Sequence, residues 1–231
     1  FVSENSGNDT NDGLTIATPV RSVNIGLQKA KSTGKSNVYI TTGNYTAAVG
    51  LSNSSYGVLI SNVNSMNIIG GWDNNFTTNV GLSILDAQNV LYRPMYIYSS
   101  ANIVLRNLVF TGGSATNTSY DTYGSGLFID TSMNINISNC NFISNTCYFA
   151  GAGIAILNSS NVNIIADISF NKVLGIGSSF GGGGVYVSSS GNLTIGGNIT
   201  ANFMSNSSYG AGIVATRSEE HTSELQSRQV I

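Results

Sequence analysis

Side chains able to do acid–base or metal chemistry are sparse in this chain. Hydrolysis of a glycosidic bond needs two neighbouring carboxyl groups, and a calcium site needs several oxygen ligands. The acidic residues before position 217 are Glu4, Asp9, Asp12, Asp73, Asp86, Asp121, Asp130 and Asp167. No two of them are adjacent, and the only histidine, His221, comes after them. We therefore predict no catalytic residues and no metal site in this region.

Two groupings come closest to a site. Arg93, Arg106 and Asp86 lie near one another in the sequence, and we interpret them as surface charges that form ion pairs. Residues 9–13 are similar in composition to a calcium loop, but they lack the bidentate Glu of the EF-hand pattern. We predict an Asn- and Asp-rich turn there, and we expect no cofactor.

Aromatic residues offer a different kind of site. A tyrosine ring has apolar faces and a polar hydroxyl, so a row of tyrosines on a surface can bind sugars. We assign Tyr96 and Tyr186 as the candidate carbohydrate-binding residues. Packing of loops onto strands is the competing interpretation for all of these rings. The aromatic residues at outward or loop positions are Tyr92, Tyr96, Tyr98, Tyr120, Tyr123, Tyr148, Phe149, Tyr186 and Tyr209.

Composition restricts the class of protein. Charged residues make up 9% of the 231 residues, against about 25% in a typical soluble domain, and the net charge is −2. A nucleic-acid partner is not expected, because binding it needs clustered Lys and Arg. No apolar run is long enough for a transmembrane helix. Asn, Ser, Thr and Gly supply the polar surface, which favours short strands joined by tight turns.

The two cysteines, Cys140 and Cys147, leave two alternatives open. They could form one disulfide across a short loop, or they could lie in the core as small free residues. The usual burial of cysteine favours the second alternative.

The chain repeats itself from about residue 38 onward. Residues 125–145, 152–171 and 183–202 align with one another, and a fourth repeat begins at Ala211. Equivalent positions are marked by Gly126, Gly153, Gly184 and Gly212, which are 27, 31 and 28 residues apart. Apolar and polar residues alternate within each repeat, which is typical of β-strands.

A repeat of this length with three short strands predicts one turn of a solenoid. Inward residues such as Leu127 and Ile129 would be buried only when the next turn stacks about 4.8 Å away. We predict an all-β fold over residues 38–216, a right-handed parallel β-helix of about five to six coils. A β-propeller or β-sandwich is the competing fold, but these folds need recurring Asn-Gly hairpins that the sequence lacks.

Residues 1–37 differ from the repeats. Thr18 followed by Pro19 is typical of a helix start. Apolar residues follow at helical spacing, at Val20, Val23, Leu27 and Ala30. We predict an N-terminal segment with an amphipathic helix over residues 19–33. This helix would cover the first coil, because an open end exposes apolar surface and unpaired strand edges.

The last residues, 217–231, differ abruptly in composition. They hold 5 of the chain's 20 charged residues. Residues 217–227 match the in-frame translation of a common sequencing-library adapter, so we interpret 217–231 as a non-native tail. A genuine C-terminal tail is the alternative. We expect the natural chain to continue beyond Thr216.

Several stretches resemble right-handed parallel β-helix surface proteins of the pectin-lyase-like superfamily. They are FVS at residues 1–3, GND at 7–9, NDG at 11–13 and GGWDNNF at 70–76. The motif GAGI at 151–154 and 210–213 is similar to the paired repeats of polymorphic outer-membrane proteins. The resemblance covers residues 1–216. It implies the β-helix fold, but the superfamily includes lyases, hydrolases, adhesins and passenger domains, so no single activity follows.

The function that we expect from the sequence is that of a non-enzymatic, exported surface or secreted protein of the adhesin or autotransporter-passenger type. It would lie outside the cell or at a bacterial outer membrane, and its partners would be glycans or proteins of a host or cell surface. One alternative is a fragment of a polysaccharide lyase or glycoside hydrolase whose catalytic coils are missing. Another is a carbohydrate-binding β-helix module.

Overall fold

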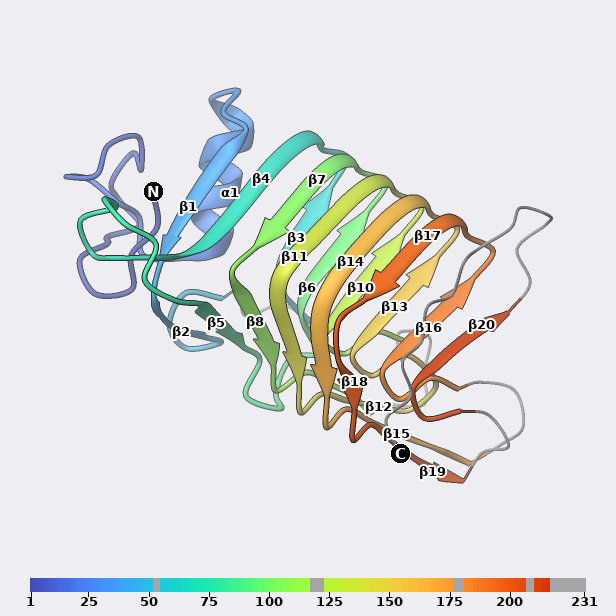
Figure 1. Cartoon of the computed structure of the whole chain (residues 1–231). Helices are drawn as coiled ribbons and strands as arrows, with labels where there is room; N and C mark the ends of the chain where they lie inside the picture. The colour runs from blue at the N-terminus through green and yellow to red at the C-terminus, as the bar shows by residue number, and fades with distance from the viewer. Residues whose placement is uncertain (52–54, 117–122, 177–180, 207–209, 217–231) are drawn as a thin grey trace.

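Parallel β-structure dominates the chain. The computed structural model describes residues 1–51, 55–116, 123–176, 181–206 and 210–216. Within these ranges the chain forms one α-helix and twenty β-strands, which belong to three parallel sheets (Figure 1). The predicted all-β class is therefore confirmed. The predicted tail, residues 217–231, lies outside the described ranges.

Each sheet collects strands from successive passages of the chain. The ten-stranded sheet contains β1 (Asn37–Thr41), β2 (Gly43–Thr46), β4 (Asn64–Trp72), β5 (Ser83–Asp86), β7 (Ala101–Arg106), β8 (Leu108–Thr111), β11 (Met133–Ile143), β14 (Ser160–Ser169), β17 (Gly191–Gly196) and β18 (Ile199–Thr200). The six-stranded sheet contains β3 (Tyr56–Ser61), β6 (Arg93–Tyr98), β10 (Leu127–Asp130), β13 (Ile154–Leu157), β16 (Val185–Ser188) and β20 (Ile213–Thr216). The four-stranded sheet contains β9 (Ser114–Ala115), β12 (Thr146–Cys147), β15 (Lys172–Ile176) and β19 (Phe203–Asn206).

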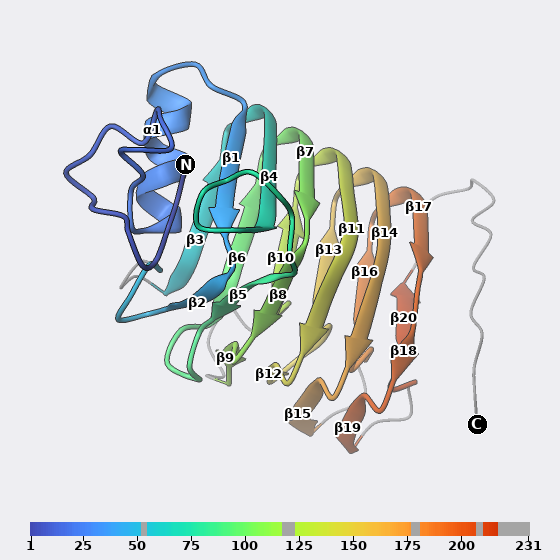
Figure 2. The ribbon, with the colours of Figure 1, turned by 60° about the vertical axis from the view of Figure 1, so that its left-hand side comes forward.

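The chain visits the three sheets in turn. From β10 in the six-stranded sheet it passes through β11 and β12 and returns as β13, which pairs with β10. Leu127 pairs with Ile154, Ile154 with Val185, and Val185 with Ile213. These partners are 27, 31 and 28 residues apart, which confirms the repeat spacing predicted from the glycines. Strands of successive passages therefore lie side by side, as Figures 1 and 2 show.

Inward side chains of successive passages form apolar columns. Two buried columns in the six-stranded sheet are Val58, Met95, Leu127, Ile154 and Val185, and Ile60, Ile97, Ile129, Ile156 and Val187. Phe110 and Phe142 are register partners whose rings stack with centroids 4.7 Å apart. A fully buried side chain of this size contributes roughly 1.5–3 kcal/mol relative to an exposed one. The core is thus built by like side chains stacking on like.

Asparagine columns shape the turns beside this core. Four exposed asparagines with positive φ are Asn102, Asn134, Asn161 and Asn192. Their side-chain amides are joined from one passage to the next by hydrogen bonds of 3.0 Å. Asn tolerates left-handed backbone better than most residues, and its amide both donates and accepts. The same residue type therefore sets the corner of the chain and links it to the next passage.

The helix α1 (Val23–Ser32) lies at the N-terminal end of the sheets, beside β1 and β3 (Figures 1 and 2). Its buried residues are Val23, Gly26, Leu27 and Ala30, so the predicted amphipathic face is confirmed. Among the described residues, no helix has the length and apolarity needed to cross a bilayer.

The predicted helix start at Pro19 is wrong. Val20 instead forms a parallel bridge with Val2, and its N–H donates to the Phe1 carbonyl. The helix begins after Ser22, whose main-chain N–H and hydroxyl both donate to the Asp9 carboxylate. Pairing with the first residues of the chain thus overrides the local helix signal at Thr18 and Pro19.

Candidate functional site

A shallow, open cleft of about 460 Å³ lies on the outer face of the six-stranded sheet. It is lined by Tyr56, Tyr96, Tyr123, Phe128, Asp130, Leu157 and Asn158. Strand alternation places four of these side chains outside the core: Tyr96, Phe128, Asp130 and Leu157. Met95 and Ile97 are fully buried in the core, so Tyr96 between them points outward. Phe128 takes the same position in β10.

One outward row contains both residues predicted as carbohydrate-binding. Tyr96 pairs with Phe128, Phe128 with Ala155, and Ala155 with Tyr186. The rings of Tyr96 and Phe128 stack with centroids 4.9 Å apart and planes 8° apart. Ala155 has no ring, and Tyr123 spans this gap, 6.3 Å from Phe128 and 5.8 Å from Tyr186. The row is therefore continuous across four strands.

Tyr186 does not present the exposed ring that the sequence predicted. Its side chain is 3% exposed, and its hydroxyl lies 3.2 Å from the Thr216 hydroxyl. Tyr96 does line the cleft, but Phe128 covers one face of its ring. The cleft therefore offers ring edges and phenol groups, where the sequence predicted a flat stacking platform.

Arg93 is fully buried beside the cleft. Its guanidinium carbon lies 5.2 Å, 5.5 Å and 5.1 Å from the ring centroids of Tyr56, Tyr96 and Phe128. Its Nε donates to the carbonyl of Gly124 at 3.1 Å, and its Nη2 donates to that of Tyr123 at 2.8 Å. Cation–π attraction of this kind is stronger when the cation is removed from water.

The predicted grouping of Arg93, Arg106 and Asp86 is not formed. Arg106 is exposed on the ten-stranded sheet, whereas Arg93 faces the rings of the six-stranded sheet. The Asp86 carboxylate accepts a hydrogen bond from the Gln88 N–H at 2.8 Å. Nearness in sequence did not bring them together because β6, which carries Arg93, belongs to the six-stranded sheet, whereas β5 and β7, which carry Asp86 and Arg106, belong to the ten-stranded sheet.

Asp130 and Asn158 form the polar rim of the cleft. The Asp130 Oδ1 accepts from the Asn158 side-chain amide at 3.1 Å and from the Thr131 hydroxyl at 3.0 Å. Asp130 is partly exposed. A carboxylate next to an amide can hydrogen-bond neighbouring hydroxyl groups of a ligand, with the tyrosines forming an apolar wall.

The carboxylates of Asp12 and Asp73 stabilise the turns in which they lie. Asp12 accepts from the Leu14 N–H and the Thr18 hydroxyl, and these bonds lower its pKa. Thr77 lowers the pKa of Asp73 in the same way. The predicted Asn- and Asp-rich turn is thus confirmed. Within the described ranges, no three His, Cys, Asp or Glu residues gather as metal ligands.

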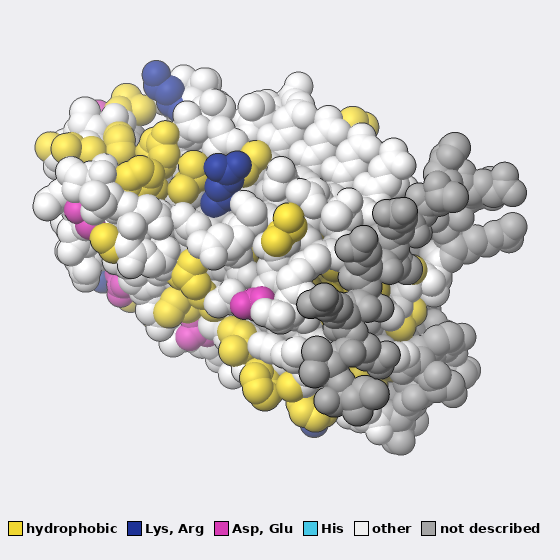
Figure 3. Space-filling model, viewed as in Figure 1, with side chains coloured by type: hydrophobic (Ala, Val, Ile, Leu, Met, Phe, Trp, Pro, Cys, Tyr) yellow, Lys and Arg dark blue, Asp and Glu magenta, His cyan; other side chains and the backbone are white. Residues whose placement is uncertain are grey.

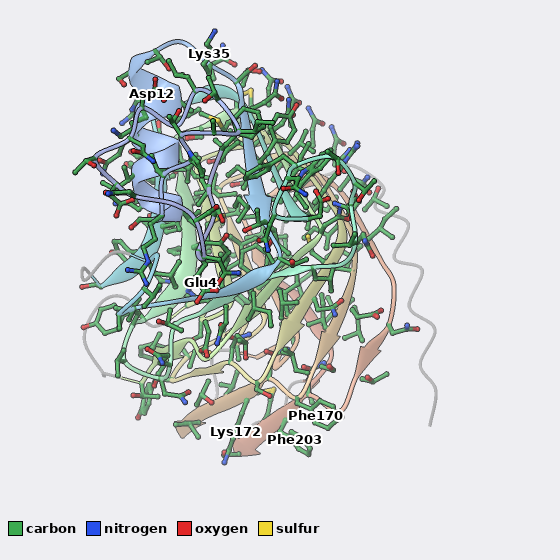
Figure 4. The ribbon with its side chains drawn as sticks, turned by 90° about the vertical axis from the view of Figure 1, so that its left-hand side faces the viewer. Glu4, Asp12, Lys35, Phe170, Lys172 and Phe203 are labelled. Carbon is green, nitrogen blue, oxygen red and sulfur yellow. The ribbon has the colours of Figure 1, made fainter. Side chains whose placement is uncertain are left out.

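Several other exposed groups lie at opposite edges of the molecule in the view of Figure 4. Asp12 and Lys35 lie at the upper, helix-bearing side of that view, whereas Phe170, Lys172 and Phe203 lie at its lower edge. Neither set lines the cleft. Four further residues named in the sequence analysis lie outside the described ranges: Asp121, Tyr120, Tyr209 and His221.

Cys140 and Cys147 are free thiols, and both are buried. Burial raises the pKa of Cys140 to about 12 and raises that of Cys147 as well. Of the two alternatives left open by the sequence, small free core residues are therefore correct. Such neutral thiols are poor nucleophiles.

Most of the residues that line the cleft were not predicted from the sequence as site residues. Tyr56, Phe128, Asp130 and Asn158 were not assigned to a site. Two of them could have been found from the repeat alignment, because Phe128 and Asp130 alternate with the inward residues Leu127 and Ile129 of the same strand. Tyr123 could not, because it lies outside the strands and reaches the row from the side.

Comparisons with family models, curated proteins and solved structures gave no match to this chain. The function of the chain must therefore be inferred from the geometry of the cleft.

Proposed function

We propose that the three sheets are the faces of a right-handed parallel β-helix, with α1 covering its first coil. Two observations support this proposal: the chain visits the sheets in a fixed order, and each sheet pairs successive passages in parallel. Parallel crossover connections are right-handed in about 98% of cases. The N-terminal segment would then be residues 1–37 and the coils residues 38–216.

We infer that this chain is a non-enzymatic, carbohydrate-binding protein that acts at a cell surface or after secretion. The observation that carries the inference is the cleft, which combines aromatic side chains with the Asp130–Asn158 pair. Sugars present both hydroxyl groups and apolar C–H surfaces. A surface site that combines aromatic rings with a few fixed polar groups suits such ligands.

The weakly charged surface supports a neutral ligand. Charged residues are 9% of the chain, and the face in Figure 3 carries few acidic or basic side chains. Such a surface provides little long-range attraction for a charged polymer, so short-range contacts must supply the specificity. A β-helix with an outward binding row is also the architecture expected of an adhesin or passenger domain, in line with the resemblance of residues 1–216 to β-helix surface proteins.

Binding and turnover of four probes test this function. The probes are hexasaccharides of β-linked glucose, of mannose and of N-acetylglucosamine, and polygalacturonate as an anionic comparison. We expect saturable binding of at least one neutral hexasaccharide by calorimetry, and no cleavage of any probe. Cleavage would contradict the non-enzymatic part of the proposal. Failure of every neutral probe to bind would contradict the assigned ligand class.

Variants of two aspartates that make the same kind of hydrogen bond test whether the cleft is the binding site. Asp130 accepts an amide hydrogen bond from Asn158, and Asp167 accepts one from Asn198 at 2.9 Å on the ten-stranded sheet. The variant Asp130→Asn should weaken binding roughly tenfold or more, because hydrogen bonds to a charged group contribute about 1.5–3 kcal/mol. Asp167→Asn should leave binding unchanged. Equal effects of the two variants would show that the cleft is not the site.

A further inference from the structure

We propose that Arg93 is a positioning residue that holds the aromatic cleft in its binding arrangement before a ligand arrives. This inference rests on the proposed carbohydrate-binding function and identifies what prepares that same site. Arg93 does not itself line the cleft. Arg93 lies beside the cleft, fully buried, and contacts the rings of three lining residues and the main-chain carbonyl of a fourth, Tyr123.

The first set of contacts joins three strands. Arg93 opens β6, and its register partner in β3 is Tyr56. Its guanidinium carbon lies within 5.5 Å of the ring centroids of Tyr56, Tyr96 and Phe128, which come from β3, β6 and β10. A flat cation that attracts three rings at once restricts the side-chain rotamers that each ring can adopt.

The second set of contacts ties Tyr123 to the sheet. The Arg93 guanidinium donates to the carbonyls of Tyr123 and Gly124, which are adjacent in the chain. Gly124 has φ +58°, so the backbone turns there, and Tyr123 bridges to Ala150. The rigid fork of Arg can satisfy two neighbouring carbonyl groups at once, whereas an ammonium group has no such fork. Arg93 therefore fixes the aromatic wall of the cleft that lies outside the strands.

This arrangement predicts a specific kinetic effect. If Arg93 keeps the cleft formed, its loss leaves only a fraction of the molecules ready to bind. The apparent Kd then rises by the reciprocal of that fraction. Association becomes slower, whereas dissociation from the formed complex is unchanged. A residue that touches the ligand directly would instead change the dissociation rate.

Association and dissociation rates of a sugar probe, measured by stopped flow with the variant Arg93→Lys, test this role. The probe is the neutral hexasaccharide that the wild-type protein binds most tightly. Arg106→Met is the matched control, because Arg106 is exposed on the ten-stranded sheet. We expect Arg93→Lys, which keeps the charge but loses the fork, to slow association about tenfold with an unchanged dissociation rate. Arg106→Met should change neither rate.

Near-ultraviolet circular dichroism provides a readout that needs no ligand. The aromatic signal of ligand-free Arg93→Lys should fall while its far-ultraviolet signal stays that of the wild type. Unchanged association together with an unchanged aromatic signal would overturn the proposal, and so would a change confined to dissociation. If no probe binds the wild type, the proposed function fails separately. The aromatic signal alone then decides whether Arg93 positions the rings.

Discussion

The side-chain amide of Asn145 donates to Oδ1 of Asn171 at 3.0 Å, and both side chains are fully buried. Asn171 repeats the bond to Asn202, also at 3.0 Å. Each Oδ1 in addition accepts a main-chain N–H from the preceding passage. Buried polar groups need partners, and this ladder supplies them from one passage to the next. The passages are thus joined by polar side chains as well as by the apolar core.

Replacing the middle member of this ladder should destabilise the protein strongly. Asn171→Ala leaves the Asn145 N–H and the Phe142 carbonyl without their partner, and each such loss costs about 1–3 kcal/mol. We expect the free energy of unfolding to fall by about 3 kcal/mol in urea titrations. Asn134→Ala in the exposed ladder is the control and should cost about 1 kcal/mol. Equal losses would mean that burial of the ladder is unimportant.

Glycine at three of the repeat positions, Gly126, Gly153 and Gly184, is required by close packing between passages. A Cβ on Gly153 would lie 2.6 Å from the carbonyl oxygen of Gly184, whereas one on Gly191 would meet nothing within 4 Å. Gly153→Ala should therefore lower the melting temperature by several degrees, about 1–3 kcal/mol in stability. Gly191→Ala should leave it unchanged or raise it slightly. A harmless Gly153→Ala would contradict the register in which Ile154 pairs with Val185.

Alkaline pH should unfold the protein by ionising buried groups. Burial raises the pKa of Cys140 from 9.0 to about 12 and that of Tyr45 from 10.0 to about 12. Both groups bind their proton more tightly when folded. Their contribution is therefore fully present below about pH 9 and is lost as the pH rises toward 12. Urea midpoints measured from pH 8 to 11 should fall steadily.

The Cys140→Ala variant separates this effect from general alkaline damage. Its urea midpoint should fall less steeply between pH 9 and 11 than that of the wild type. The reason is that ionisation of the buried Cys140 thiol no longer contributes to the pH dependence of stability. An identical slope would show that the Cys140 thiol does not contribute.

Much of the fold could be predicted because the spacing of the repeats shows which residues pair between strands. Equivalent glycines such as Gly153 and Gly184 lie where one passage approaches the next, so their spacing revealed which strands pair. The helix start could not be predicted, because the backbone of Val20 is held by Val2 and Phe1, which are far from it in sequence. Local helix signals carry no information about such partners.

The candidate site was predicted only in part, for a related reason. Strand alternation correctly placed Tyr96 outside the core, and the same rule placed Tyr186 there. Whether an outward ring is exposed depends on what covers it, and Tyr123 packs against Tyr186 from outside the repeats. The burial of Arg93 was missed similarly, because its partners at Tyr123 and Gly124 lie 30 and 31 residues away.

The central claim is that the cleft on the six-stranded sheet binds a neutral glycan, and calorimetric titration of two tyrosine variants tests it most directly. Tyr96 lines the cleft, whereas Tyr98, 40% exposed on the same strand, does not. With the tightest-binding neutral hexasaccharide, Tyr96→Ala should raise Kd about tenfold or more, and Tyr98→Ala should leave it unchanged. Melting temperatures of both variants above the assay temperature would show that the fold is intact. Unchanged affinity of Tyr96→Ala, or an equal loss in Tyr98→Ala, would contradict the claim.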